Sequence, residues 1–468
     1  MASRIHLESS GSAAVTPSSA LAGWNKTSGA HGPYRSAYGP LLTDYGTSKT
    51  NAASGTSGHF TLMSRHIIGP FVAAQTVDGT VKGQIRCNET TGTDSYTTAI
   101  GLKVIQADGS DRGTLLAVTG SDDSSTDPPE MNVSTLENRA FRDASENASI
   151  TLSSVSAQVG DYLVIEIGFR QGSTSVNNAT MQVGTANPAG TAPLGDLTED
   201  DTSISTLLSW LEFSKDLAIL EYYGSNSVPI DIGDGSGTNT ADPTAITPPA
   251  GMGSEASYLT CMIGQQRATG ATLAITEAGG QSWTTEAAVG ITNQTDRLFW
   301  CQFDGTWDAD PSVDFGATTC NSVHMHVWRA PVGFTWAVNV ALAETEDATG
   351  PYANPGQTTT GTAPTLTLVG WFTADDNSWD ASADAGWYVA GTAQYRNNSG
   401  SDQSASYEYH FQYAAGATGA VDKAQNTITG DACTTFAITF SATAPAVVAF
   451  IAQKPFIVRQ AVNRASTY

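Results

Sequence analysis

The sequence predicts an all-β protein, with a jelly-roll-like N-terminal sandwich followed by two related, smaller β-sandwich domains. Only 14% of the residues are charged, while glycine alone contributes 46 of the 468 residues. Long amphipathic helices need leucine, glutamate, lysine and arginine in quantity, so this composition favours short strands joined by turns. A chain of this length exceeds what one hydrophobic core usually organises, which indicates two to four domains.

Residues 1–60 form the first segment, which is rich in serine, glycine, threonine and tyrosine and has only short apolar groups. Such a composition offers little apolar surface to bury within the chain itself. We therefore expect an extended or irregular N-terminal arm that becomes ordered against a partner.

Residues 61–215 show the alternation that is typical of strands. The run 207–213 fits both helical spacing and a closing strand, and its β neighbourhood favours the strand. Roughly eight strands joined by short turns predict a two-sheet sandwich of the jelly-roll type. The best candidate for a central core strand is 162–170, because one of its faces is wholly apolar: Leu163, Ile165, Ile167 and Phe169.

The C-terminal half contains one sequence pattern that occurs twice. The pattern is an apolar strand, a glycine followed within three residues by a tryptophan, an aromatic strand, a strand led by cysteine and an Ala-Pro pair. Five features in one order favour an internal duplication, although residue identity between the copies is low. The predicted segments are a linker at 216–250, copy 1 at 251–345, a linker at 346–363, copy 2 at 364–455 and a C-terminal tail at 456–468.

The net charge of −24 comes from 45 acidic against 21 basic residues. Most of such a surface would repel a phosphate backbone or an anionic membrane, so we expect neither nucleic acid nor membrane as a partner. The N-terminus has no apolar signal segment, and no apolar run approaches the roughly 20 residues of a membrane span. We expect a soluble chain that is synthesised in a cytoplasm.

The five cysteines are sparse, lie mostly among predicted strand residues and form no Cys-x-x-Cys motif. This distribution favours buried free thiols over a disulfide framework. A bridge from Cys261 to Cys301 or Cys320 is the alternative.

Candidate metal ligands are present but incomplete. His324 and His326 lie two residues apart on a predicted strand, which places both imidazoles on one face, but no third zinc ligand follows at a suitable spacing. The alternation favours a polar sheet face instead. Two acidic loops lack the spacing of a calcium site, so we predict no metal and no cofactor. These loops contain Asp122, Asp123 and Asp127, and Asp231, Asp234 and Asp242.

The sequence contains no G-x-S-x-G, H-E-x-x-H, phosphate-binding loop or dinucleotide fingerprint. Many carboxylates are present, but nothing singles out two of them as the pair of a glycosidase. We therefore predict that the chain is not an enzyme and has no catalytic residues.

Tryptophans are concentrated in the duplicated region, and exposed aromatic rings stack on sugars. Trp300 and Trp387 lie within strand patterns, which favours core packing for both. Trp307 and Trp379 lie in Gly- and Asp-containing loops. These two are the candidate ligand-binding residues if the chain binds a glycan.

Several short runs carry a resemblance to known proteins: 113–116, 138–139, 160–168 and 211–213 in the first half, and 276–283, 298–301 and 370–377 in the second half. These runs resemble proteins encoded among the structural genes of tailed bacteriophages and prophages. The resemblance extends over most of the chain after about residue 60, and its motifs are those of strands and turns rather than of a site.

This resemblance implies a virion component built of β-sandwiches. Together with the acidic composition, it predicts a non-enzymatic structural protein of the virion, attached to the capsid exterior, as a capsid decoration protein is, or to the tail. Its expected partners are other virion proteins and further copies of itself, because virion symmetry favours homo-oligomers. The alternative is a carbohydrate-binding adhesin or receptor-binding module, whose partner would be a host surface glycan.

Overall fold

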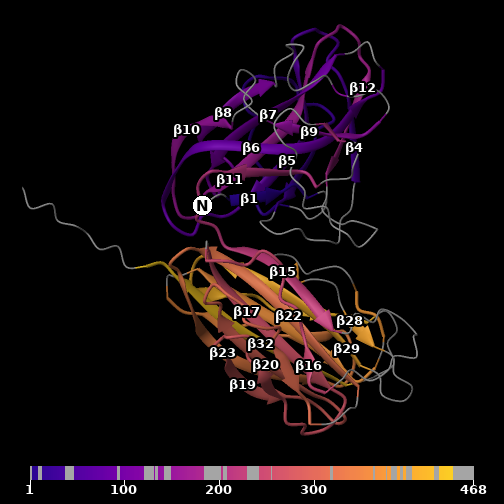
Figure 1. The fold of residues 1–468 in the computed structure, drawn as a ribbon, viewed down its shortest axis with the longest axis vertical. Coiled ribbons are helices and arrows are strands. Elements are labelled where there is room, and N and C mark those ends of the chain that lie inside the picture. The colour runs from indigo at the N-terminus through magenta and orange to yellow at the C-terminus, as the bar shows by residue number, and fades with distance from the viewer. Residues whose placement is uncertain are drawn as a thin grey trace, which may run out of the picture.

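The computed structural model contains two bodies, an N-terminal one and a C-terminal one (Figure 1). Every regular element that it assigns is a β-strand, which confirms the all-β prediction. No helix in the described part of the chain is long and apolar enough to cross a membrane. The structure describes residues 3–8, 13–36, 47–91, 95–120, 131, 135–141, 149–183, 202–203, 208–228, 242–254, 256–316, 320–361, 364–375, 377–380, 387–390, 394–396, 403–425 and 432–445.

The N-terminal body is a sandwich of two sheets whose inner faces share one apolar core. The sandwich prediction is thus confirmed, while its jelly-roll topology stays a prediction. One sheet contains β1 (Ser3–His6), β4 (Thr47–Ala52), β6 (Gln75–Glu89), β9 (Glu137–Phe141), β10 (Ile150–Ala157), β12 (Asn178–Val183), β13 (Thr202–Ser203) and β14 (Trp210–Phe213). The other contains β2 (Trp24–Lys26), β3 (His31–Arg35), β5 (Phe60–Ile68), β7 (Tyr96–Ile105), β8 (Asp111–Gly120) and β11 (Tyr162–Gln171).

Two strand predictions are confirmed in this sandwich. β11 lies between β5 and β7, and its alternate apolar residues fill the core as the pattern predicts. The ambiguous run ends in the strand β14, which pairs with β6 and with β1. A strand prevails over a helix there because β6 and β1 pair with the backbone of β14 on its two sides.

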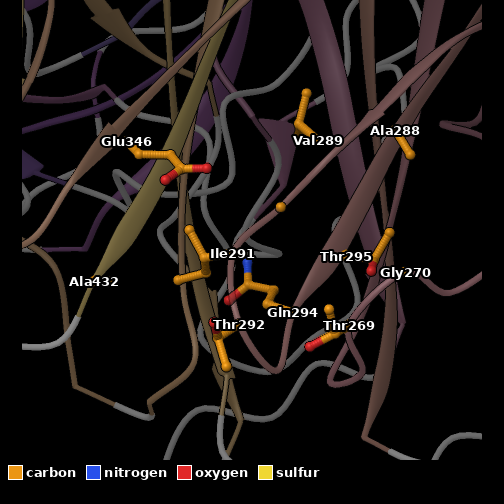
Figure 2. Close-up of a pocket in the computed structure, with 11 residues that line it drawn as sticks. Thr269, Gly270, Ala288, Val289, Ile291, Thr292, Gln294, Thr295, Glu346 and Ala432 are labelled. Carbon is orange, nitrogen blue, oxygen red and sulfur yellow. The ribbon is translucent and has the colours of Figure 1, made fainter.

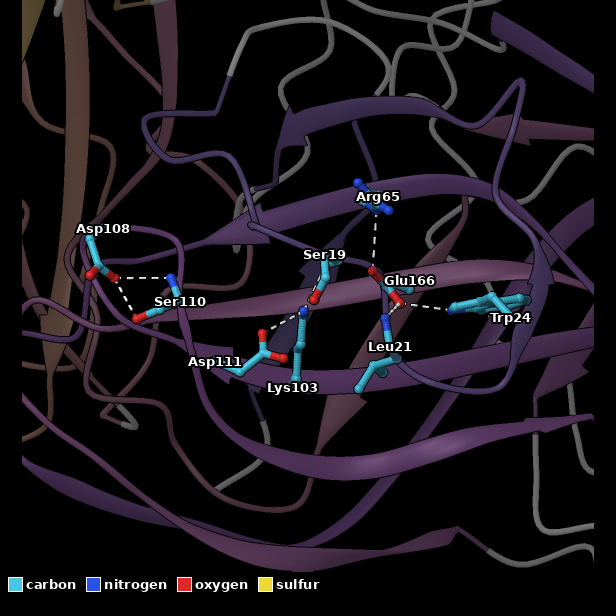
Figure 3. Close-up of polar contacts among 9 residues, drawn as sticks. All are labelled: Ser19, Leu21, Trp24, Arg65, Lys103, Asp108, Ser110, Asp111 and Glu166. Carbon is cyan, nitrogen blue, oxygen red and sulfur yellow. Dashed lines mark hydrogen bonds and ion pairs between the residues drawn. The ribbon is translucent and has the colours of Figure 1, made fainter.

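Residues 3–8 and 13–36 lie on the chain's own sandwich, which differs from the predicted arm. Strand β1 pairs with β14, and a later stretch crosses the outer face of the sheet that contains β11. There the buried carboxylate of Glu166 accepts hydrogen bonds from Leu21 N at 2.9 Å and Trp24 Nε1 at 2.7 Å (Figure 3). Arg65 forms an ion pair with the other oxygen of Glu166. Leu21 and Trp24 of the N-terminal segment thus supply donors for a charge that the sheet buries.

The C-terminal body consists of two units. Unit 1 contains β15 (Glu221–Val228), β16 (Thr244–Ala245), β17 (Ala256–Gln266), β18 (Ala274–Glu277), β19 (Thr284–Val289), β20 (Thr295–Gln302), β21 (Ser312–Asp314) and β22 (Asn321–Pro331). Unit 2 contains β23 (Thr335–Asp347), β24 (Tyr352–Asn354), β25 (Thr358–Thr359), β26 (Thr365–Thr373), β27 (Tyr388–Val389), β28 (Gln394–Arg396), β29 (Gln403–Gln412), β30 (Gly416–Ala417), β31 (Val421–Lys423) and β32 (Cys433–Thr443).

The two units share their strand order, which supports the predicted duplication. The large sheets run β15-β22-β17-β20-β19 and β23-β32-β26-β29-β27, so that each unit's first strand lies beside its last. A small sheet likewise pairs the second strand with the last but one, β16 with β21 and β24 with β31. Strands β15 and β16 lie in the segment 216–250, and β24 and β25 in 346–363, where the sequence predicts linkers. These strands are short or polar, so their alternation is weak.

The two large sheets pack face to face rather than standing apart as separate domains. Residues of both sheets belong to one buried cluster, whereas each outer face has its own core with a small sheet or loops. The body is therefore layered, with the two large sheets inside. We call the contact between them the seam; its near end lies beside the N-terminal sandwich, and its far end lies by β19 and the start of β20 (Figure 1).

Candidate functional site

The near end of the seam joins all three parts of the chain. Arg35 extends from β3 of the N-terminal sandwich, and its Nη1 donates to the hydroxyl of Tyr409 at 2.6 Å. The guanidinium carbon also lies 4.4 Å from the ring centre of Tyr388, a cation–π distance. Tyr409 in turn stacks on Tyr222 of unit 1, with ring centres 5.2 Å apart. One cation thus ties the N-terminal sandwich to both units.

Buried acids accompany this cation. Glu221 is 4% exposed, and burial raises its pKa to about 8 against the opposing charges of Arg35 and Arg329. Arg329 itself pairs with Asp216 at the end of the N-terminal sandwich. The near end therefore combines apolar packing with charges that lie next to opposite charges, as burial of a charge requires.

The middle of the seam holds the two histidines that the sequence places on one face. His324 and His326 are 1% and 2% exposed, and the ring of Tyr407 from unit 2 lies 4.5 Å from that of His326. His324 contacts the hydroxyls of Ser227 and Ser322, each at 3.1 Å. Burial lowers the pKa of both imidazoles to about 3, so both are neutral near pH 7.

The histidine pair packs against aromatic rings. Tyr222 Oη and His326 Nδ1 are 3.3 Å apart, and the ring centres of Trp328 and Tyr407 lie 6.1 and 4.5 Å from that of the imidazole. Among the described residues, no group of three or more His, Cys, Asp or Glu side chains is arranged to hold a metal ion. In this arrangement the pair is part of the sheet packing.

The far end of the seam is built from amides and hydroxyls. Ser322 donates to Gln265 Oε1 at 3.2 Å, and Gln265 Nε2 donates to the backbone oxygen of Ser404 at 3.2 Å. Gln403 of unit 2 donates to Ser322 at 3.0 Å, which closes the network across the two sheets. Polar groups at this end thus take the place that aromatic rings hold at the near end.

A buried acid lies next to this network. Asp296 is fully buried, and its Oδ2 accepts from Gln294 Nε2 at 2.7 Å, while its Oδ1 has no hydrogen-bond partner in the described structure. Burial raises the pKa of Asp296 well above its usual range. The carboxyl is therefore held in an environment that favours its neutral form.

A solvent-open hollow of about 500 Å³ lies at this end, between loops of unit 1 and strand β23 of unit 2 (Figure 2). Gln294 and Glu346 line it together with the apolar side chains of Val289 and Ile291. Gln294 is 1% exposed, and its Oε1 has no partner among the described residues. At this hollow an unpartnered buried group therefore borders open space.

The two predicted ligand-binding tryptophans lie apart from this hollow. Trp379 is 4% exposed and packs edge-on against Tyr352, so its ring faces are covered. Trp307 is half-buried, with its ring stacked 5.0 Å from Phe303 and tilted against Trp283. Both rings belong to the outer cores of their units. The structure leaves part of Trp307 open and almost none of Trp379.

The other candidates from the sequence have structural roles or lie outside the described residues. All five cysteines are buried thiols and not disulfides. Cys261 lies opposite Trp300 in the register of β17 and β20, so Cys301 points to the other face of the sheet. Asp242 accepts a hydrogen bond from Phe315 N at 2.8 Å. The remaining acids of the two loops lie outside the described residues: Asp122, Asp123, Asp127, Asp231 and Asp234.

Sequence reasoning missed Arg35, Asp296 and Gln294. Arg35 lies in the segment predicted to be an arm, and its partner Tyr409 is 374 residues away. Gln294 lies in a Thr- and Asn-containing turn that resembles any polar loop, and Asp296 is the second residue of the strand β20 that follows it. One signal was available for Asp296: it shares a strand face with Leu298 and Trp300, which marks an acid on an apolar face.

Comparison of the sequence with protein-family models finds no matching family, and comparison with curated proteins finds no match.

Proposed function

We propose that the chain is a non-enzymatic structural component of a phage virion, attached to the capsid exterior or the tail and projecting its β-sandwich domains outward. The observation that carries the proposal is the seam together with its near end. Arg35 and Asp216 tie the first sandwich to a C-terminal body in which the two units share one core. Such a chain extends as one stiff unit from its point of attachment.

Three further features support this proposal. The imidazoles of the seam are neutral and packed against rings, so they contribute to rigidity rather than to proton transfer. A net charge of −24 keeps a repeatedly displayed protein dispersed. The runs that resemble phage structural proteins extend over both the sandwich and the units. Other virion proteins and further copies of the chain are the partners that this role requires.

The test uses particles of the phage or induced prophage that encodes the chain. Virions purified by density gradient are analysed by quantitative mass spectrometry and by immunogold electron microscopy with antibodies to the whole chain. We expect a fixed copy number per particle and gold on the outer surface or the tail. Virions that lack the chain, or a chain found only in the lysate, would overturn the proposal.

A carbohydrate-binding adhesin or receptor-binding module is the second candidate, and the hollow at the far end of the seam favours it. Because Trp379 is buried, it is not available to stack on a glycan. The hollow is therefore the expected contact site. A glycan array with the intact chain separates the two roles, since a pure scaffold gives no sugar-dependent signal.

A further inference from the structure

The hollow at the far end of the seam borders two hydrogen-bond acceptors, the buried Oε1 of Gln294 and the exposed carboxylate of Glu346. Gln294 uses its Nε2 on Asp296, at 2.7 Å, and its Oε1 is left without a donor. A buried acceptor without a donor carries a desolvation cost, which a hydrogen bond from a ligand hydroxyl would offset. In Figure 2 the Gln294 side chain and the Glu346 carboxylate border the same space.

Glu346 is the one ionisable side chain among the residues that line the hollow. It is exposed on β23, and no hydrogen bond or ion pair holds it in the described structure. Neighbouring Glu344 has a different task, since it accepts from Gly290 N at 2.9 Å and fixes the loop. A lining with a carboxylate and no cation disfavours anionic ligands and suits molecules rich in hydroxyl donors.

The remaining lining is apolar or fixed in place. Val289, Ile291 and Ala288 offer aliphatic surface beside the acceptors. The hydroxyl of Thr295 donates to Ala268 O at 2.6 Å, and that of Thr269 accepts from Asn293 N at 2.7 Å. The loops are thus held by their own hydrogen bonds, so the hollow is formed before a ligand arrives.

We propose that this hollow binds a neutral saccharide. A sugar ring combines hydroxyl donors, for Gln294 Oε1 and Glu346, with C–H faces for the aliphatic side chains. A volume of about 500 Å³ lies within the roughly 300–1,000 Å³ of small-molecule sites. This site lies outside Trp307 and Trp379 and goes beyond the structural role, because a scaffold needs no ligand.

The test uses the full-length chain on an array of neutral, acidic and amino-containing mono- to tetrasaccharides. Hits are followed by isothermal titration and by saturation-transfer NMR with the free sugar. Ala288→Trp fills the hollow from an exposed position in β19, so it blocks the site without entering a core. Glu346→Ala removes the carboxylate, and we expect it to weaken binding about tenfold or more. Asp308→Asn changes an exposed acid by Trp307 and is the matched control.

Support consists of binding by a neutral saccharide that Ala288→Trp abolishes, Glu346→Ala weakens and Asp308→Asn leaves unchanged. No binding of any neutral saccharide at about 10 mM would overturn the proposal. So would binding that survives Ala288→Trp, binding that Trp307→Ala abolishes instead, or binding of cationic ligands alone. Circular dichroism of each variant shows that it is folded. Particles that lack the chain would overturn the structural role and leave this result standing.

Discussion

The two ends of the seam are made by the same pair of sheets but from different chemistry. At the near end, aromatic rings surround Arg35, whose Nη1 donates to Tyr409. At the far end, Gln265, Ser322 and Gln403 form an amide and hydroxyl network. The near end is covered by the N-terminal sandwich, whereas the far end borders an open hollow. The side chains at the two ends differ because the near end contacts the N-terminal sandwich and the far end contacts the hollow.

The contrast shows that two sheets with the same strand order can make different contacts at the two ends of the seam. The strand order is the same in both units, so the backbone alone does not distinguish one end of the seam from the other. Side chains make the distinction: Tyr409 and Tyr222 stack at one end, and Asp296 and Gln294 remain partly unpartnered at the other. This difference predicts that the near end contributes most to stability and that the far end is where a ligand binds. Three substitutions test this division.

Arg35→Ala has the largest expected effect, because it removes the cation that joins the three parts of the chain. Loss of the charged hydrogen bond to Tyr409 and of the contact with Tyr388 leaves Glu221 with less compensation. We expect the free energy of unfolding to fall by about 3 kcal/mol. Urea denaturation monitored by tryptophan fluorescence measures it, and we expect a separate early transition of the N-terminal sandwich.

Lys82→Ala is the matched control for that experiment. Lys82 pairs with Glu212 at 3.3 Å on the N-terminal sandwich, and its side chain is 35% exposed. Such a pair contributes less than about 1 kcal/mol. If both substitutions lower the free energy of unfolding by the same amount, the near end does not hold the parts of the chain together. The contrast between the two ends of the seam would then be wrong.

The sequence predicts the architecture well, because a half-buried sheet requires alternation and this chain shows it. Strand β11 and the single face of His324 and His326 follow from spacing alone. The arm prediction for 1–60 fails to anticipate β1, since a four-residue strand has too few positions to show a period. The N-terminal segment is ordered by partners that are distant in sequence: β1 pairs with β14, and Leu21 N donates to Glu166. Local composition does not reveal such partners.

The site was harder to predict for a related reason. Trp379 lies in a polar loop, yet the loop folds back so that the ring is covered by Tyr352 and the chain pairs with Gln425. Composition describes the neighbours of a residue in sequence, whereas burial depends on its neighbours in space. Gln294 shows the converse, a polar turn residue that is buried because β23 passes beside its loop.

The next largest expected effect is the loss of stability when the histidines in the middle of the seam are protonated. Burial lowers the pKa of His326 to about 3, whereas the unfolded chain titrates near 6.5. The unfolded state therefore binds more protons between these values, and stability falls as the pH drops below about 6.5. At pH 5 this single group costs about 2 kcal/mol relative to pH 7.

His326→Phe removes the titration and keeps a ring beside Trp328 and Tyr407. We expect a loss of about 1 kcal/mol at pH 7, because Tyr222 loses its contact with Nδ1. At pH 5 the variant should equal or exceed the original chain in stability. Thermal unfolding at both pH values, with each protein as its own reference, gives the comparison, and parallel pH profiles would show that His326 is not buried in solution.

Asp296→Asn at the far end has the smallest expected effect and the opposite sign. Burial raises the pKa of Asp296, so the folded state binds a proton that the unfolded state releases. Stability from this group is complete below the unfolded pKa near 4 and falls as the pH rises above it. Asparagine keeps an acceptor for Gln294 Nε2 and removes the charge. We expect a gain of about 1 kcal/mol at pH 7.5 and none at pH 4, measured by urea denaturation at both values. A loss at pH 7.5 would mean that the carboxylate is stabilised in the folded chain, and the far end would then resemble the near end.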